Sequence, residues 1–211
     1  MVFVRSIDVT AINDIVNGVT VDGKYLWWTG SSRDKEAIYQ MDKSGNIIQT
    51  IIVTATDAKP QGITTDGKYL WWVGGNSKRI YQMDKSGNII RSINVVGLDA
   101  TPYGIAVDGK YLWLTGYTTD NIFQLDKAGN LIRTIAVAGI DLTPRGIATD
   151  GKYLWLIGAT GDNIYQLDKT GNLIRTIAVG ATDTTPGGIA TDGKYLWWTG
   201  DLNNIIVQWA K

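Results

Sequence analysis

Short apolar stretches recur along the whole chain and are separated by polar segments rich in Gly, Asp and Lys. The segment that begins at Pro144 is typical, with the runs GIATD, YLWLI, NIYQLD and LIRTIAV separated by turn-forming residues. Runs of this length, rich in Ile, Tyr, Trp and Val, predict β-strands rather than helices. We therefore predict four strands, over 146–150, 153–157, 163–168 and 173–179.

The second of these runs is apolar on both of its alternating faces. Tyr153 and Trp155 fall on one face, and Leu154 and Leu156 fall on the other. A sheet with one face in water would alternate apolar and polar residues, so both faces of this sheet must be covered. The Asp-Gly pair between the first two runs predicts a tight type I′ hairpin turn.

The hexapeptide DGKYLW occurs five times and defines an internal repeat. Its copies begin at Asp22, Asp66, Asp108, Asp150 and Asp192, with spacings of 44, 42, 42 and 42 residues. Four strands in such a period are typical of a propeller blade, in which each sheet covers the faces of its neighbours. The units that start at Asp108 and Asp150 are identical at 32 of 42 positions, which indicates recent duplication or engineering.

The two ends of the chain complete one unit between them. The last unit stops at the third strand, and residues 5–9 align without a gap with the fourth-strand residues 133–137. We predict an all-β fold and one domain over 1–211. It is a five-bladed β-propeller with four antiparallel strands per blade, in which residues 1–9 supply the outer strand that closes the last blade.

The consensus TPxGIAxDGKYLWLTGxxxDNIYQLDKxGNLIRTIAV resembles NHL and YVTN-type propeller repeats over essentially all five units. Families with such repeats include protein-interaction platforms, RNA-binding propellers, cell-surface proteins and a few lyases. The resemblance thus implies a propeller and leaves function open, and an extracellular parent is compatible with it. Lyases of this kind depend on histidine, and this chain has none.

The amino-acid composition excludes several kinds of catalytic and metal site. The absence of His and Cys removes the imidazole base, the thiolate nucleophile and the His or Cys metal centre. Twenty basic and twenty acidic side chains give a formal charge of zero, which argues against a nucleic-acid partner. We expect no signal peptide, because the N-terminal residues show neither an apolar h-region nor a cleavage site, and no apolar run is long enough for a membrane span. We expect a monomer that is not an enzyme, without catalytic residues, cofactor, metal or membrane partner.

Two sets of repeated residues are interpreted as structural. One set precedes the first strand of each unit and consists of Asp57, Asp99, Asp141, Asp183 and Asn13. Their oxygen atoms could surround a cation at the channel mouth. Because the carboxylates are single and evenly spaced, we favour the interpretation that they cap turns. The Trp of DGKYLW, as in Trp113 and Trp155, is predicted to fill the space between blades. The second Trp of three units is replaced by Leu in the others, which also indicates a core position.

Function is expected where the units differ. The position just before the first-strand Gly holds Asn17, Gln61, Tyr103, Arg145 and Gly187, and the loops between second and third strands add Arg33, Tyr117 and Asp201 on the same rim. Aromatic and Arg side chains on rigid strands are typical of binding surfaces. We expect a noncatalytic binding propeller that recognises a glycan, peptide or protein at the channel mouth. The alternative is a structural or engineered scaffold without a natural ligand, in which these positions have drifted.

Overall fold

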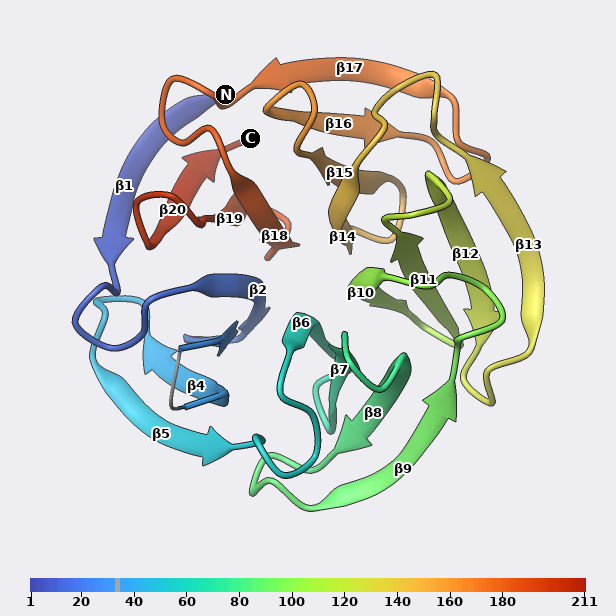
Figure 1. Ribbon diagram of the computed structural model, residues 1–211. Helices are drawn as coiled ribbons and strands as arrows, with labels where there is room; N and C mark the ends of the chain where they lie inside the picture. The colour runs from blue at the N-terminus through green and yellow to red at the C-terminus, as the bar shows by residue number, and fades with distance from the viewer. Residues whose placement is uncertain (33–34) are drawn as a thin grey trace.

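The computed structural model describes residues 1–32 and 35–211 and shows five four-stranded antiparallel sheets in a ring (Figure 1). The first blade consists of β2 (Val16–Asp22), β3 (Tyr25–Gly30), β4 (Ala37–Asp42) and β5 (Ile47–Ile52). The second consists of β6 (Pro60–Thr65), β7 (Leu70–Gly74), β8 (Arg79–Met83) and β9 (Ile89–Asn94). The third consists of β10 (Pro102–Asp108), β11 (Tyr111–Gly116), β12 (Asn121–Asp126) and β13 (Leu131–Ala136).

The last two blades complete the ring. The fourth consists of β14 (Pro144–Thr149), β15 (Leu154–Gly158), β16 (Asn163–Leu167) and β17 (Leu173–Ala178). The fifth consists of β18 (Pro186–Thr191), β19 (Tyr195–Gly200), β20 (Ile205–Ala210) and the N-terminal strand β1 (Val2–Asp8). Strand β1 pairs antiparallel with β20, from Val2 opposite Ala210 to Asp8 opposite Ile205. The predicted five-bladed propeller, closed by its N-terminal strand, is confirmed.

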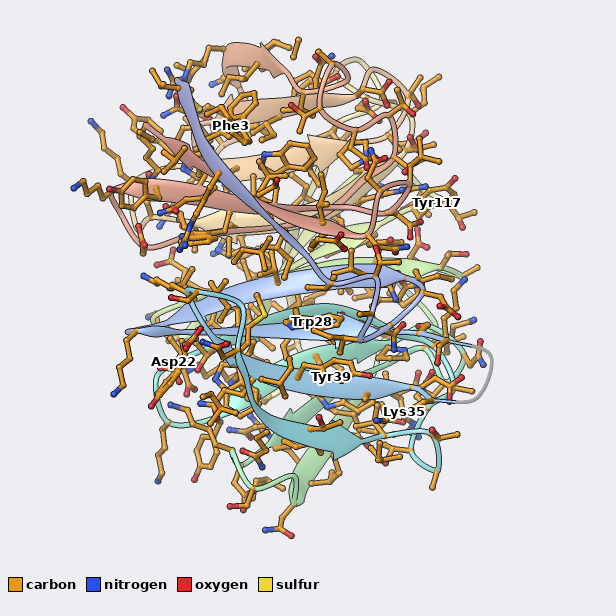
Figure 2. The ribbon with its side chains drawn as sticks, turned by 90° about the vertical axis from the view of Figure 1, so that its left-hand side faces the viewer. Phe3, Asp22, Trp28, Lys35, Tyr39 and Tyr117 are labelled. Atoms are coloured by element: carbon orange, nitrogen blue, oxygen red, sulfur yellow. The ribbon has the colours of Figure 1, made fainter. Side chains whose placement is uncertain are left out.

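The innermost strands are the first of each blade, and the outermost are the fourth (Figure 1). Seen from the side, Asp22 lies toward one rim, whereas Lys35 and Tyr117 lie toward the other (Figure 2). We call the first the turn rim, because it carries the Asp-Gly-Lys turns, and the second the loop rim. Nowhere in residues 1–32 and 35–211 is there a helix long and apolar enough to cross a membrane.

The Asp-Gly-Lys turns differ from the predicted type I′ turn. In the first blade Asp22 pairs with Tyr25, so the two loop residues are Gly and Lys, and only Gly23 has a positive φ, of 61°. Positive φ at the first loop residue is the type II′ pattern. In the second blade pairing stops at Thr65, whose hydroxyl group accepts from the Gly67 N–H. The side chain before the Asp therefore selects between two turns.

The conserved-looking Trp of each unit is buried between blades, as predicted. Trp155 is only 1% exposed and packs against Ile189, Leu196 and Trp198 of the next blade. The second aromatic position is equally buried: Trp28 stacks on Tyr39 with ring centroids 4.2 Å apart (Figure 2). Both positions are therefore core.

Backbone contacts join the inner strands around the axis. The glycines of the five first strands each face the backbone of the next blade, so that a Cβ on Gly188 would lie 2.6 Å from the Asn17 carbonyl oxygen. In alternate units a Thr bridges this contact. The Thr199 hydroxyl group accepts from the Gly188 N–H at 2.6 Å and donates to the Asn17 carbonyl at 2.7 Å. The hydroxyl group thus ties the last blade to the first.

Removal of this bridge tests its contribution. We expect Thr199→Val to lower the free energy of unfolding by about 1–3 kcal/mol, because two buried backbone groups lose their partner. Val73 occupies the same position in the second blade and is fully buried. Val73→Thr, which can form the same bridge, should match or exceed the wild type in urea unfolding. Equal losses for both substitutions would contradict a bridging role.

A second ring of contacts joins the blades at the turn rim. The Asp of each Asp-Gly-Lys turn forms an ion pair with a Lys of the following blade, and the fifth blade pairs with the first. The pairs are Asp22–Lys85, Asp66–Lys127, Asp108–Lys169, Asp150–Lys211 and Asp192–Lys43. The rim of repeated charges interpreted from the sequence as structural is thus a cyclic set of interblade ion pairs, each worth up to about 1 kcal/mol.

Acid should weaken this ring. Burial alone would raise the pKa of Asp150, but hydrogen bonds from the Trp155 indole, the Tyr153 amide and Lys211 together lower this pKa to about 2. A lowered pKa in the folded state means that the stabilisation is complete above about pH 4 and is lost as the pH falls toward 2. Urea unfolding between pH 2.5 and 7 should therefore show stability falling below pH 4.

Asp150→Asn supplies the test of that assignment. The variant should be less stable than the wild type at pH 7 and should lose part of its acid dependence, since one of the titrating carboxylates is gone. Asp14→Asn, at an exposed carboxylate on the loop rim, is the matched control. An unchanged pH profile for Asp150→Asn would show that this ion pair does not contribute.

Candidate ligand-binding cleft

A β-bulge places the variable residue of each unit at an equivalent position near the loop-rim end of the first strand. In the third blade Pro102 pairs with Gly116 and Ile105 pairs with Leu114, so two residues, Tyr103 and Gly104, lie opposite one. The same register shift occurs in all five first strands. Such bulges re-aim side chains and are frequent beside functional sites. The repeat thus supplies one rigid backbone position per blade at which side chains can be exchanged.

Three of these variable side chains meet in one cleft. Gln61, Tyr103 and Arg145, from three consecutive blades, line a cavity of about 240 Å³ on the loop rim. The remaining lining residues are Lys59, Thr101 and Tyr117. The structure therefore brings together four of the seven residues predicted from the sequence, namely Gln61, Tyr103, Tyr117 and Arg145.

The aromatic and cationic groups of the cleft are stacked. The rings of Tyr103 and Tyr117 lie 6.5 Å apart between centroids, at an angle of 29°. The Arg145 guanidinium lies over the Tyr103 ring, 5.8 Å from its centroid, and donates to the Pro186 carbonyl at 3.3 Å. This arrangement holds the guanidinium group in place through a cation–π contact while leaving most of its donors unused.

Two polar atoms of the cleft are buried without a partner. Gln61 is only 2% exposed, and its Oε1 accepts no hydrogen bond from any described residue. The Nε of Arg145 is also buried and donates no hydrogen bond to any described residue. A buried polar atom without a hydrogen bond costs about 1–3 kcal/mol. Both atoms belong to side chains that line the cleft, but the atoms themselves are shielded from solvent, so a ligand would reach them only after these side chains turn.

The protonation states at the mouth are set by burial. Burial raises the pKa of the Tyr103 hydroxyl to about 12; Arg145 opposes the shift, whereas Asp201 and Tyr117 add to it. Burial also raises the pKa of Asp201, against the effect of Arg145 and with that of Asp183. Tyr103 is therefore a hydrogen-bond donor at neutral pH, and Asp201 lies close enough to Arg145 for their charges to interact.

The other predicted site residues have different surroundings. Asn17 donates to Ser31 Oγ at 3.0 Å and to the Pro60 carbonyl at 2.9 Å, and it does not line the cleft. Asp201 lies near Arg145 but outside the cleft lining. Arg33 lies outside the described residues. The predicted set is thus divided between a cleft, an interblade contact and a neighbouring acid.

The carboxylates before the first strands cap turns, which was the favoured interpretation. Asp57 accepts from the Lys59 N–H at 2.7 Å and from the Ser77 N–H at 2.7 Å. Asp99 makes equivalent bonds to Thr101 and Thr119 in the next blade. These buried oxygens tie the two kinds of loop together. Among residues 1–32 and 35–211 no group of three or more acidic side chains is placed to hold a metal ion.

The remaining cavities are less suited to a specific ligand. A cavity of about 90 Å³ lies among the inner strands and is lined by residues such as Thr20, Thr64 and Ala148. That volume is far below the 300–1,000 Å³ typical of drug-sized ligands. Two depressions of about 500 and 510 Å³ lie on the turn rim, where Asp66–Lys127 and Asp192–Lys43 already pair. These depressions repeat between blades, as structural features do.

Sequence reasoning missed two residues of the cleft, Lys59 and Thr101. The position before the first-strand Pro holds Thr in three units, Thr101, Thr143 and Thr185, but Lys in the second unit. A comparison of the units at this position would have marked Lys59 as different. Lys59 therefore differs from its counterparts one residue before the Pro, whereas the predicted set was drawn from the position after the Pro and from the loops between second and third strands.

Comparison with known proteins gives similarity of fold. No family model matches this sequence, and a search of curated proteins finds no match. Among solved structures, Myxococcus xanthus glutaminyl cyclase aligns with a TM-score of 0.79 at 14% identity, over 98% of this chain and 94% of that one.

Two further solved structures show the same kind of similarity. A catalytically inactive Staphylococcus aureus virginiamycin B lyase with quinupristin has a TM-score of 0.60 at 22% identity, over 92% of this chain and 69% of that one. A nidogen/laminin complex has a TM-score of 0.67 at 19% identity, over 92% of this chain and 75% of that one. At these identities the comparisons establish the propeller fold, and the NHL or YVTN character of the repeats has no matching family model.

The prediction that this chain is not an enzyme is corrected here. It rested on the missing His and Cys, yet two of these structures of similar fold are of enzymes. Enzymes therefore occur on this fold, so the missing His and Cys do not exclude catalysis, and identities of 14% and 22% transfer no mechanism. In the cleft, Tyr103 can donate a hydrogen bond and Arg145 can attract an anion.

Proposed function

We propose that this propeller binds a polar ligand, a part of a peptide, glycan or protein, in the cleft between Gln61, Tyr103 and Arg145. The observation that carries the proposal is that three different residues at one repeated position line one cavity. Two of these residues, Gln61 and Arg145, also carry a buried polar atom without a partner among the described residues. The aromatic pair adds contact area at low entropic cost.

Substitution of the aromatic and cationic groups tests the cleft. We expect Tyr103→Ala and Arg145→Ala each to weaken binding about 10- to 100-fold, which is typical of interface positions that dominate affinity. Both side chains lie at the rim and are partly exposed, so stability should change by only about 1 kcal/mol. Ligands would be found by thermal shift with peptide and glycan panels, and affinities measured by calorimetry.

The size of the thermal shift is itself predicted. A ligand at 100 times its dissociation constant adds about 2.7 kcal/mol, which for a domain of this length corresponds to about 5–10 °C. Tyr111→Ala and Arg79→Ala, at a tyrosine of the turn rim and an arginine outside the cleft, are matched controls. Mass spectrometry of the recovered ligand would report any turnover. Binding that survives both cleft substitutions would favour the scaffold alternative.

A further inference from the structure

The inference that follows rests on the proposed function and names the ligand class of the same cleft. We propose that the cleft takes the C-terminal end of a peptide, with Arg145 on the terminal carboxylate, Gln61 on the adjacent peptide unit and the tyrosine pair on the last side chain. Each of the three contacts depends on a separate observation.

The first observation is an unpaired cation in acidic surroundings. The loop rim carries, among its described residues, five basic and ten acidic side chains: Lys35, Lys59, Lys78, Arg79 and Arg145 against Asp8, Asp14, Glu36, Asp57, Asp99, Asp120, Asp141, Asp162, Asp183 and Asp201. Two of these five, Lys59 and Arg145, line the cleft, and no acidic residue does. The lining of the cleft is therefore basic, with Asp201 near Arg145 but outside the lining.

Arg145 is available to a carboxylate. Within the described chain it forms no ion pair, and its one hydrogen bond runs from Nη1 to the Pro186 carbonyl. Its buried Nε donates to nothing described. A guanidinium group binds a carboxylate through two parallel N–H donors, and that planar match is specific to carboxylates and phosphates. The guanidinium group also lies over the Tyr103 ring, a contact that limits its movement.

The second observation is the buried carboxamide of Gln61. Its Oε1 accepts no hydrogen bond from any described residue, although Gln61 is 2% exposed. Whichever way the amide is turned, it offers one acceptor and donors side by side, which complements the N–H and C=O of a peptide unit. Asn17 at the same position of the first blade donates through its Nδ2 to Ser31 and to the Pro60 carbonyl. Gly75 replaces Ser31 in the second blade, so Gln61 lacks that partner.

The third observation is the size and wall of the cavity. A volume of about 240 Å³ is smaller than a site for a whole drug-sized molecule, so it fits the end of a chain rather than its middle. The stacked rings of Tyr103 and Tyr117 form an apolar wall beside Arg145. A C-terminal residue combines a carboxylate, a peptide unit and a side chain within that space, which matches the three kinds of group present.

Two immobilised peptide libraries test the proposal. One holds N-acetylated tripeptides with free C-terminal carboxylates, and the other holds the same tripeptides with C-terminal carboxamides. We expect the protein to be retained by the first and to bind the best sequence at least 10-fold more weakly when that sequence is amidated. Arg145→Met and Gln61→Leu should each lose at least 10-fold in affinity for the free acid, whereas the matched variant Arg79→Met should bind as the wild type does.

The remaining outcomes separate the inference from the proposed function. Equal binding of acid and amide forms would overturn the carboxylate contact. Binding of glucuronic acid or inorganic phosphate at the cleft, without any free-acid tripeptide, would leave a ligand site and reject the peptide end. Absence of binding by tripeptides, glucuronic acid, phosphate and a glycan array would reject both. A bound tripeptide that is insensitive to Arg145→Met and Gln61→Leu would place the site elsewhere. Thermal unfolding of each variant verifies that it remains folded.

Discussion

Trp155→Ala is expected to lower the free energy of unfolding by about 3–5 kcal/mol, the usual cost of removing a large buried aromatic side chain. The ring is 1% exposed and packs into the interface with the fifth blade. Arg175 and Lys211 lie over its faces, 5.4 and 4.8 Å from the centroid, and its Nε1 donates to Asp150 at 2.9 Å. The substitution therefore removes packing, two cation–π contacts and a hydrogen bond together. Urea unfolding followed by fluorescence of the remaining tryptophans measures the loss.

The equivalent Trp113 separates packing from hydrogen bonding. It is fully buried, but its Nε1 has no partner among the described residues. Trp113→Ala should therefore cost as much in packing, whereas Trp113→Phe should cost less than Trp155→Phe, which leaves Asp150 without its indole donor. Lys110→Ala, in the turn beside Trp113, should stay within about 0.5 kcal/mol. Comparable small effects for the tryptophans and for Lys110 would contradict the burial argument.

The fold could be predicted because several independent patterns agree. Strand-like apolar runs, turn residues, a period of 42 residues and the fit of residues 5–9 to 133–137 all indicate the same ring of blades. The shape of the Asp-Gly-Lys turn could not be predicted in the same way. The turn shape depends on whether Val or Thr precedes the Asp. The Thr65 hydroxyl group accepts a hydrogen bond from the Gly67 N–H and donates one to the Tyr69 carbonyl, and Val cannot form either bond. The side-chain hydrogen bonds of Thr compete with the backbone hydrogen bonds that would extend the hairpin, and the outcome depends on the folded geometry.

The sequence predicted where the cleft lies, but it did not predict all of the residues that line it. Variation between units identified Gln61, Tyr103 and Arg145, because a repeat fixes what packing needs and leaves other positions free. Whether such a side chain faces a ligand depends on its neighbours. Asn17 is shorter than Gln61 by one methylene group and finds Ser31, which no comparison of single positions reveals. Lys59 enters the cleft because loops of adjacent blades abut, a contact between residues distant in sequence.

The N-terminal strand is the one element that joins the two ends of the chain in a single sheet. Ile7 and Val9 are buried in the cluster that also holds Trp197 and Ile206. Arg5 donates to Gln208 at 2.9 Å and lies over the Trp197 ring at 5.6 Å. The strand contributes core packing and pairs with β20 over most of its length, with an irregularity between Phe3 and Arg5, so its loss should affect the whole ring.

Deletion of residues 1–9 should therefore expose β20 as an unpaired edge and produce dimers or aggregates in place of a stable monomer, since a flat apolar edge is a template for pairing. Size-exclusion chromatography with light scattering and thermal unfolding measure both effects. A synthetic peptide of residues 1–9, added in trans, should restore part of the melting temperature. A circular permutant that joins Lys211 to Met1 and opens between β5 and β6 keeps every strand and should remain a folded monomer, because Val2 already lies opposite Ala210. A deletion variant with unchanged melting and monomeric elution would show that the first strand does not close the ring energetically, whatever its pairing.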